Sequence, residues 1–106
     1  MRKFGVPYQG SKSRIAEKLI DVLPKGNRFV DLFAGGCAMT HAAMISGKYK
    51  SVLANDLFPH GLHVFKNALA GEYSKPEYLR WVSREEFFAL KDTDDFIRLV
   101  YSFGNN

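Results

Sequence analysis

The spacing of apolar residues predicts a helix near the start of the chain. The residues that recur at helical spacing are Ile15, Leu19, Ile20 and Leu23. Ser11 or Ser13 is expected to cap its first turn, because a serine hydroxyl accepts a hydrogen bond from a free backbone N–H group. Segment 24–27 contains a proline and a glycine and is expected to end this helix. Pro7 favours an extended loop before it.

Two short runs of strand-forming residues follow, and a helix is expected after each of them. The runs 29–33 and 51–54 are apolar and predict strands. The small, apolar segment 37–45 predicts a buried helix that ends at Ser46-Gly47, and 61–70 predicts another helix. The apolar face of this second helix is expected to hold Leu62, Phe65 and Leu69. Helix, strand, helix, strand, helix is half of a doubly wound α/β fold with parallel strands.

The chain beyond Gly71 is expected to be helical throughout. Ser83 and Glu86 have the spacing of a capping box, which predicts a helix that carries Phe87, Phe88 and Leu90. Acidic residues suit the first turn of a helix, so Asp94 and Asp95 predict the start of a last helix. That helix is expected to carry Phe96, Leu99 and Val100. Segment 102–106 is expected to begin a loop.

Length and composition fit one small globular domain. The chain has 106 residues, 46% of them hydrophobic and 14% aromatic. It contains no apolar run near the ~20 residues that cross a bilayer and no signal peptide. The single cysteine, Cys37, excludes an intramolecular disulfide and fits a reducing compartment, so we expect a soluble cytoplasmic protein. Fifteen basic and 11 acidic residues give a net charge of +4, a mild preference for an anionic partner such as nucleic acid.

The turn after the first predicted strand is the best candidate for a ligand site. Ala34-Gly35-Gly36 follows that strand directly, and glycine lets a ligand approach the backbone closely. The helix behind the turn offers free N–H groups to an anionic ligand group. Asp56, 20 residues after Gly36, ends the second strand, where an acidic side chain can accept hydrogen bonds from ribose hydroxyls. The pattern therefore predicts a nucleoside cofactor with an anionic tail.

Each of these residues also has an ordinary structural explanation. Two glycines after a strand can be only a turn, and Asn55-Asp56 can be a turn or a helix cap. Segment 35–40 does not match the Gly-x-Gly-x-x-Gly pattern of dinucleotide-binding proteins, which argues against NAD. No pattern supports Cys37 as a nucleophile, and His60 and His63 lack further metal ligands. We therefore expect no metal site.

Three segments resemble the N-terminal motifs of Dam-type (D12 class) DNA adenine-N6 methyltransferases, which bacteria and phages encode. They are Tyr8-Gln9-Gly10-Ser11-Lys12, segment 29–36 and Leu53-Ala54-Asn55-Asp56, and the likeness covers roughly residues 4 to 70. The resemblance implies an incomplete Rossmann-like fold that binds S-adenosylmethionine. It assigns Lys12 to the methionine carboxylate and Asp56 to the ribose. The implied cofactor-binding residues are Tyr8, Gly10, Lys12, Asp31, Phe33, Ala34, Gly35, Gly36 and Asp56. Cys37 stands where the family often has a third glycine.

These enzymes also carry a catalytic Asp-Pro-Pro-Tyr type motif, which this sequence lacks. Its four prolines are all unpaired. We therefore expect residues 1–71 to form a cofactor-binding segment and 72–106 a helical extension toward recognition and catalytic regions outside the sequence. The sequence alone is expected to be inactive, with DNA as the partner of the full-length enzyme. The uncovered edges of two strands also suggest a homodimer or a domain swap.

Three other functions stay open at this point. The chain can belong to a methyltransferase of the same fold that acts on RNA or on other atoms of DNA. It can be part of a NAD-type dehydrogenase, although the glycine spacing disfavours this. It can also be a non-catalytic, basic nucleic-acid-binding module, which differs from the others in binding no adenosyl ligand.

Overall fold

Two parallel strands form the sheet of the computed structural model, which describes residues 3–101. β1 (Gly26–Asp31) and β2 (Tyr49–Ala54) are joined by α2 (Ala38–Ser46), so the predicted α/β unit is confirmed. The register pairs Val30 with Leu53 and Asp31 with Ala54, so both strands end at the same edge of the sheet. The segments that follow the two strands therefore start side by side.

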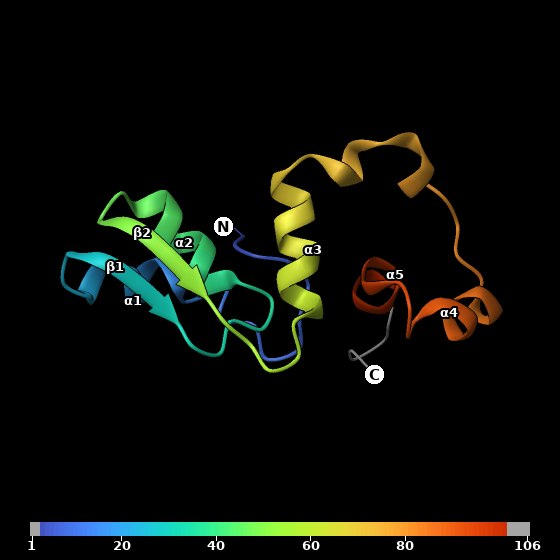
Figure 1. Ribbon diagram of the computed structural model, residues 1–106, viewed down its shortest axis with the longest axis horizontal. Coiled ribbons are helices and arrows are strands. Elements are labelled where there is room, and N and C mark those ends of the chain that lie inside the picture. The colour runs from blue at the N-terminus through green and yellow to red at the C-terminus, as the bar shows by residue number, and fades with distance from the viewer. Residues whose placement is uncertain (1–2, 102–106) are drawn as a thin grey trace.

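The helices α1 (Ala16–Val22) and α2 cover one face of this sheet (Figure 1). The buried residues between these layers are Phe4, Ala16, Ile20, Ala38, Ala42 and Ala43, with Phe29 and Val52 of the strands packed against them. The small side chains of α2 let the helix lie close to the strands. α2 ends at Gly47 in the left-handed conformation, as the sequence predicts.

α3 (His60–Leu69) stands between the α/β layers and the C-terminal helices (Figure 1). It buries Val64 and Phe65, and the ring of Phe65 packs near Ala34. The predicted apolar face was partly wrong, because Leu69 is 53% exposed. Leu69 lies in the last turn of α3, beyond the part of the helix that packs.

The C-terminal part is only partly helical, so the prediction that the chain beyond Gly71 is helical throughout was wrong. Two 3-10 turns, η1 (Glu72–Ser74) and η2 (Pro76–Tyr78), precede α4 (Arg84–Leu90) and α5 (Asp95–Val100). Both predicted helix starts are confirmed. Ser83 Oγ accepts a hydrogen bond from the Glu86 N–H group, and Asp94 Oδ1 accepts one from Ile97, each at 3.1 Å. α5 packs beside α3, where His63 Nδ1 lies 2.9 Å from an Asp95 oxygen. The loop expected at 102–106 lies outside the described residues.

The serine cap predicted for the first helix was wrong. Ile15 occupies the N-cap position and makes no side-chain cap hydrogen bond. Ser13 Oγ instead accepts a hydrogen bond from the Phe4 N–H group at 2.9 Å, and Ser11 Oγ accepts one from the Ser13 N–H group. The apolar face is also narrower than predicted. Ile20 is buried, whereas the partly exposed members are Ile15, Leu19 and Leu23.

The first strand begins and ends earlier than the apolar run suggests. Leu32 and Phe33, predicted to lie in this strand, form a turn and are 58% and 88% exposed. Asn55 explains the change of direction, because its N–H group donates to the Asp31 carbonyl while its own carbonyl accepts from Ala34. β2 likewise starts two residues before the predicted run 51–54. None of the helices within residues 3–101 is long and apolar enough to span a membrane.

Candidate functional site

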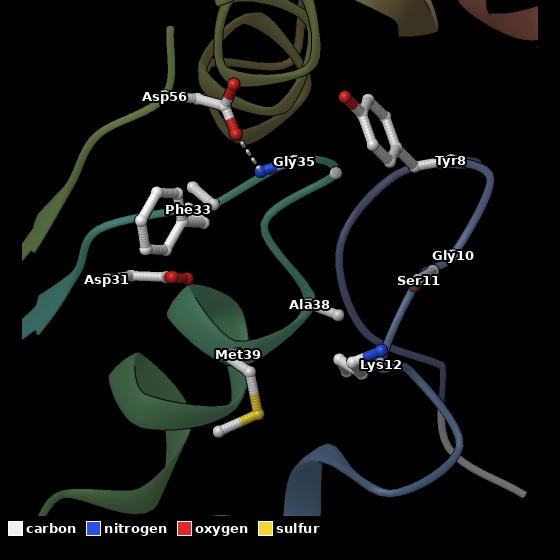
Figure 2. Close-up of a pocket in the computed structure, with 12 residues that line it drawn as sticks. Tyr8, Gly10, Ser11, Lys12, Asp31, Phe33, Gly35, Ala38, Met39 and Asp56 are labelled. Atoms are coloured by element: carbon white, nitrogen blue, oxygen red, sulfur yellow. Dashed lines mark hydrogen bonds between the residues drawn. The ribbon is translucent and has the colours of Figure 1, made fainter.

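A pocket of about 260 Å³ lies where the segments after β1 and β2 meet the N-terminal loop (Figure 2). All nine residues that the sequence analysis singled out line it. They are Tyr8, Gly10, Lys12, Asp31, Phe33, Ala34, Gly35, Gly36 and Asp56. Three further residues line the pocket that the sequence did not assign to the site, Ser11, Ala38 and Met39. Their positions inside the first motif and directly after the glycine turn were the signals that could have found them.

Asp31 reaches the pocket from the last position of β1. Its Oδ2 atom accepts a hydrogen bond of 2.7 Å from the Thr40 hydroxyl, and Thr40 is buried in α2. Asn55 fixes the same edge through the backbone hydrogen bonds described above and through its Nδ2 group, which donates to the Leu32 carbonyl at 3.1 Å. These bonds hold the carboxyl ends of both strands together and set the path of the loop between β1 and α2.

Asp56 holds this loop from the other side (Figure 2). Its Oδ2 atom accepts a hydrogen bond from the Gly35 N–H group at 2.8 Å, and its Oδ1 atom accepts one from Phe58 at 2.9 Å. Both bonds lower the pKa of the Asp56 carboxyl below its ordinary value, and the bond from Phe58 has the larger effect. The carboxylate is therefore ionised at neutral pH, and each oxygen keeps a further lone pair for a ligand hydroxyl.

Two backbone N–H groups of the glycine turn, those of Ala34 and Gly35, are already occupied by hydrogen bonds within the chain. Ala34 donates to the Asn55 carbonyl, Gly35 to Asp56, and Cys37 to the Ala34 carbonyl at 2.7 Å. The pairing of β1 with β2 ends at Asp31, and these hydrogen bonds hold the backbone of the turn beyond that point. The side chain of Lys12 and the first turn of α2, where Ala38 and Met39 line the pocket, are available to an anionic ligand group.

The glycines are required mainly by the packing of this turn against its neighbours. Gly35 has a φ of +53°, and a Cβ atom there would lie 3.0 Å from the Tyr8 ring. A Cβ atom on Gly36 would lie 2.6 Å from the Cβ atom of Tyr8 and 2.7 Å from the Val6 carbonyl oxygen. On the other side of the turn, a Cβ atom on Gly61 of α3 would clash with the Gly35 carbonyl oxygen. The turn thus fits between the N-terminal loop and α3 only without side chains.

Tyr8 and Lys12 bring the N-terminal loop to the pocket. The Tyr8 ring stacks on His60, with centroids 5.8 Å apart and an interplanar angle of 30°. Lys12 is exposed, and within residues 3–101 no carboxylate lies at ion-pair distance from its ammonium group. The pocket is therefore lined by one positive side chain, Lys12, and by two negative ones, Asp31 and Asp56.

Cys37 is buried beneath the pocket in the left-handed conformation, with φ of 68°. A glycine would adopt this conformation without strain, so the cysteine stands at a conformationally demanding position. Burial, reinforced by the negative charges of Asp31 and Asp56, raises the pKa of its thiol to about 12. The thiol is therefore protonated at neutral pH and poorly nucleophilic.

His41 has a structural position that the sequence did not indicate. Its Nδ1 atom accepts a hydrogen bond of 3.0 Å from the Gly5 N–H group, and its ring packs edge-on against Phe4 and Phe65. Burial lowers the pKa of this imidazole. The described part of the chain holds no group of three or more His, Cys, Asp or Glu side chains that could bind a metal ion.

The chain is an α/β protein with a pocket lined by charged side chains at the carboxyl edge of its parallel strands. A family model for D12 class N6 adenine-specific DNA methyltransferases matches residues 8–104, and the chain belongs to this family. It is 29% identical over 106 residues to the retron Ec67 DNA adenine methylase of Escherichia coli. That alignment covers 89% of this chain and 36% of the relative, so the chain spans about a third of that protein's length. No solved structure matched.

Proposed function

We propose that the pocket binds S-adenosylmethionine and that the chain is the cofactor-binding part of a Rossmann-like DNA adenine-N6 methyltransferase. The observation that carries the proposal is the convergence of three separate segments of a D12 family chain on one pocket. Residues 1–71 supply this pocket, and 72–106 extend toward the recognition and catalytic regions. When bound, the cofactor supplies the methyl group that is transferred to the adenine amino nitrogen.

The side chains that line the pocket match the functional groups of this cofactor. Lys12 suits its carboxylate, Asp31 its amino group and Asp56 its ribose hydroxyls, while the exposed Phe33 ring offers an apolar surface to the adenine. S-adenosylmethionine carries a net positive charge, which the two carboxylates and one ammonium group favour. The negatively charged pyrophosphate of NAD would meet two carboxylates here. The charges therefore support the methyl donor over the dinucleotide.

DNA is the substrate that this proposal assigns to the whole enzyme. The chain contains no Asp-Pro-Pro-Tyr type motif to accept hydrogen bonds from the target amino group and to stack on a flipped base. Binding the cofactor and transferring its methyl group are therefore separate properties. We expect residues 1–106 to bind the cofactor but not to transfer its methyl group.

Equilibrium dialysis with radiolabelled S-adenosylmethionine tests this proposal. Lys12→Met is expected to weaken binding about tenfold or more, because a charge-assisted hydrogen bond contributes about 1.5–3 kcal/mol. Lys18→Met, which removes an exposed lysine of α1 outside the pocket, is the matched control and should leave affinity unchanged. Equal affinity of both variants and the wild type would refute the site. Plasmid DNA methylated by the purified chain would refute the second part of the proposal.

A further inference from the structure

Thr40 differs from the other polar side chains of residues 3–101 because it alone is buried, with 5% of its surface exposed. It lies in α2 among small apolar residues, where a valine would have nearly the same shape and no hydroxyl group. A buried hydroxyl group without a partner destabilises a fold, so buried hydroxyl groups are almost always hydrogen-bonded. The partner of this hydroxyl group therefore indicates what Thr40 does.

The Thr40 hydroxyl group donates to another element of the fold and not to its own helix. A threonine within a helix commonly donates to the carbonyl group three or four residues earlier. The two carbonyl groups at those positions, of Gly36 and Cys37, already accept backbone hydrogen bonds of 2.8 and 2.9 Å. Thr40 donates instead to Asp31 Oδ2 at 2.7 Å, a short distance that is typical of a hydrogen bond to a carboxylate.

This hydrogen bond sets the direction of the Asp31 carboxylate at the pocket. Asp31 is the last residue of β1 and lines the pocket, and its carboxylate lies next to α2 (Figure 2). Because a carboxylate is planar, a bond that holds Oδ2 also restricts where Oδ1 points. Within residues 3–101, Thr40 is the one hydrogen-bond partner of this carboxylate, so both oxygens keep acceptor positions for a ligand. An ammonium group, which has three donors, suits such a carboxylate.

We propose that Thr40 is a positioning residue that orients the Asp31 carboxylate toward the amino group of S-adenosylmethionine, an inference that rests on the proposed function. Without the hydroxyl group, the Asp31 side chain is free to rotate, and a ligand has to order it on binding. The resulting loss of affinity is confined to ligands that carry an ammonium group. Thr40 therefore acts on the amino group of the cofactor, whereas Lys12 is assigned to its carboxylate.

NMR titration of the chain with two ligands tests this inference, because the method also measures weak affinities. Thr40→Val keeps the shape of the side chain and removes the hydroxyl group. It should weaken the binding of S-adenosylmethionine about fivefold, the typical loss when a ligand has to order one side chain. Its affinity for 5′-methylthioadenosine, which lacks the amino-acid part of the cofactor, should not change. Thr40→Ser, which keeps the hydroxyl group, should bind both ligands as the wild type does.

Two further variants make the comparison specific. Thr93→Val is the matched control, because it removes a hydroxyl group from an exposed threonine that donates to the Leu90 carbonyl at 3.3 Å. Its affinity for both ligands should equal that of the wild type. In an Asp31→Ala background, Thr40→Val should cause no additional loss, since the hydroxyl group then has no carboxylate to orient.

A third ligand separates the two ends of the amino-acid part. Decarboxylated S-adenosylmethionine keeps the amino group and lacks the carboxylate. Thr40→Val should weaken its binding by the same factor as that of S-adenosylmethionine, whereas Lys12→Met should leave it unchanged. If circular dichroism shows that Thr40→Val is unfolded, Thr40→Ala carries the same expectations, because alanine already occupies positions 42 and 43 of this helix.

Unchanged affinity of Thr40→Val for S-adenosylmethionine, or a loss that Thr40→Ser does not restore, would overturn the inference. An equal loss for S-adenosylmethionine and 5′-methylthioadenosine would show that Thr40 supports the whole pocket, and would overturn the inference as well. A wild-type chain that does not bind S-adenosylmethionine would refute the proposed function itself. The wild-type titration therefore distinguishes failure of the proposed function from failure of the role of Thr40.

Discussion

At the scale of single residues, the polar side chains of the pocket hold its backbone as well as facing its interior. Asp56 accepts hydrogen bonds from Gly35 and Phe58, and Asp31 accepts one from Thr40. A ligand would therefore meet carboxylates whose directions are already fixed, which lowers the entropy lost on binding. The same bonds mean that a substitution at Asp56 removes a loop anchor together with the proposed ligand contact.

His41 should make stability depend on pH. Its pKa is lowered by burial below the ordinary value of 6.5, so the unfolded chain binds the proton more readily than the folded chain. The stabilisation is complete above about pH 6.5 and is lost as the pH falls through the lower pKa of the folded state. Urea unfolding at pH 7.5 and 5.5 should show a smaller pH effect in His41→Gln than in the wild type. His63→Gln, at an exposed histidine, should retain the pH effect of His41. An identical pH dependence in wild type and His41→Gln would contradict this role.

At the scale of elements, hydrophobic spacing predicted which helices and strands exist better than where they end. The run 29–33 is apolar except for Asp31, yet its last two residues lie outside the strand. The backbone of Asn55 pairs with Asp31 and Ala34 and leaves out Leu32 and Phe33 between them. Sequence spacing cannot reveal such a partner 20 or more residues away. Sequence spacing also could not predict how many apolar side chains of α1 are buried. The exposure of Leu19 depends on how α1 packs against α2, which lies far away in the sequence.

The C-terminal end of α1 depends on Lys48. The Nζ group of this lysine donates hydrogen bonds to the backbone carbonyls of Ile20, Asp21 and Leu23 at the last turn of the helix, where carbonyls have few or no partners within the helix. Lys48→Met should lower the free energy of unfolding by about 1–2 kcal/mol, because a cation at this helix end and its charged hydrogen bonds are both lost. Lys50→Met, at an exposed neighbour, should change stability by less than about 0.5 kcal/mol in the same urea titrations. Equal losses in the two variants would contradict the capping role.

A further prediction concerns the close contact between Gly61 of α3 and the glycine turn. Gly61→Ala should gain about 1 kcal/mol from helix propensity. The added Cβ atom would nevertheless lie within 3 Å of the Gly35 carbonyl oxygen, and overpacking of this kind costs about 1–3 kcal/mol. We therefore expect a net loss of stability and weaker ligand binding, because Gly35 is the residue that Asp56 anchors. Gly26→Ala is the control, since the nearest atom there is 3.8 Å away. A Gly61→Ala variant as stable as wild type would show that this contact relaxes freely.

At the scale of the whole molecule, the sequence predicted the site more fully than the fold. Motif spacing brought together residues from the N-terminal loop, the glycine turn and the end of β2, and the structure gathers all of them at one pocket. The use of the turn's own N–H groups could not be predicted, because it depends on Asn55 and Asp56 folding back on that turn. Which strand residues are exposed could not be predicted either. Val30 and Leu53 are 45% and 51% exposed, although their side chains suit a buried strand equally well.

Calorimetric titration with S-adenosylmethionine and with NAD is the most direct test of the central claim. We expect the chain to bind S-adenosylmethionine and not NAD. Asp56→Ala should weaken that binding at least tenfold. The Asp56 carboxylate accepts a hydrogen bond from Gly35 and, in the proposed site, hydrogen bonds from the ribose hydroxyls. Asp21→Ala, which removes an exposed carboxylate of α1, should bind as the wild type does. Absence of S-adenosylmethionine binding, comparable binding of NAD, or an Asp56→Ala variant of unchanged affinity would contradict the account.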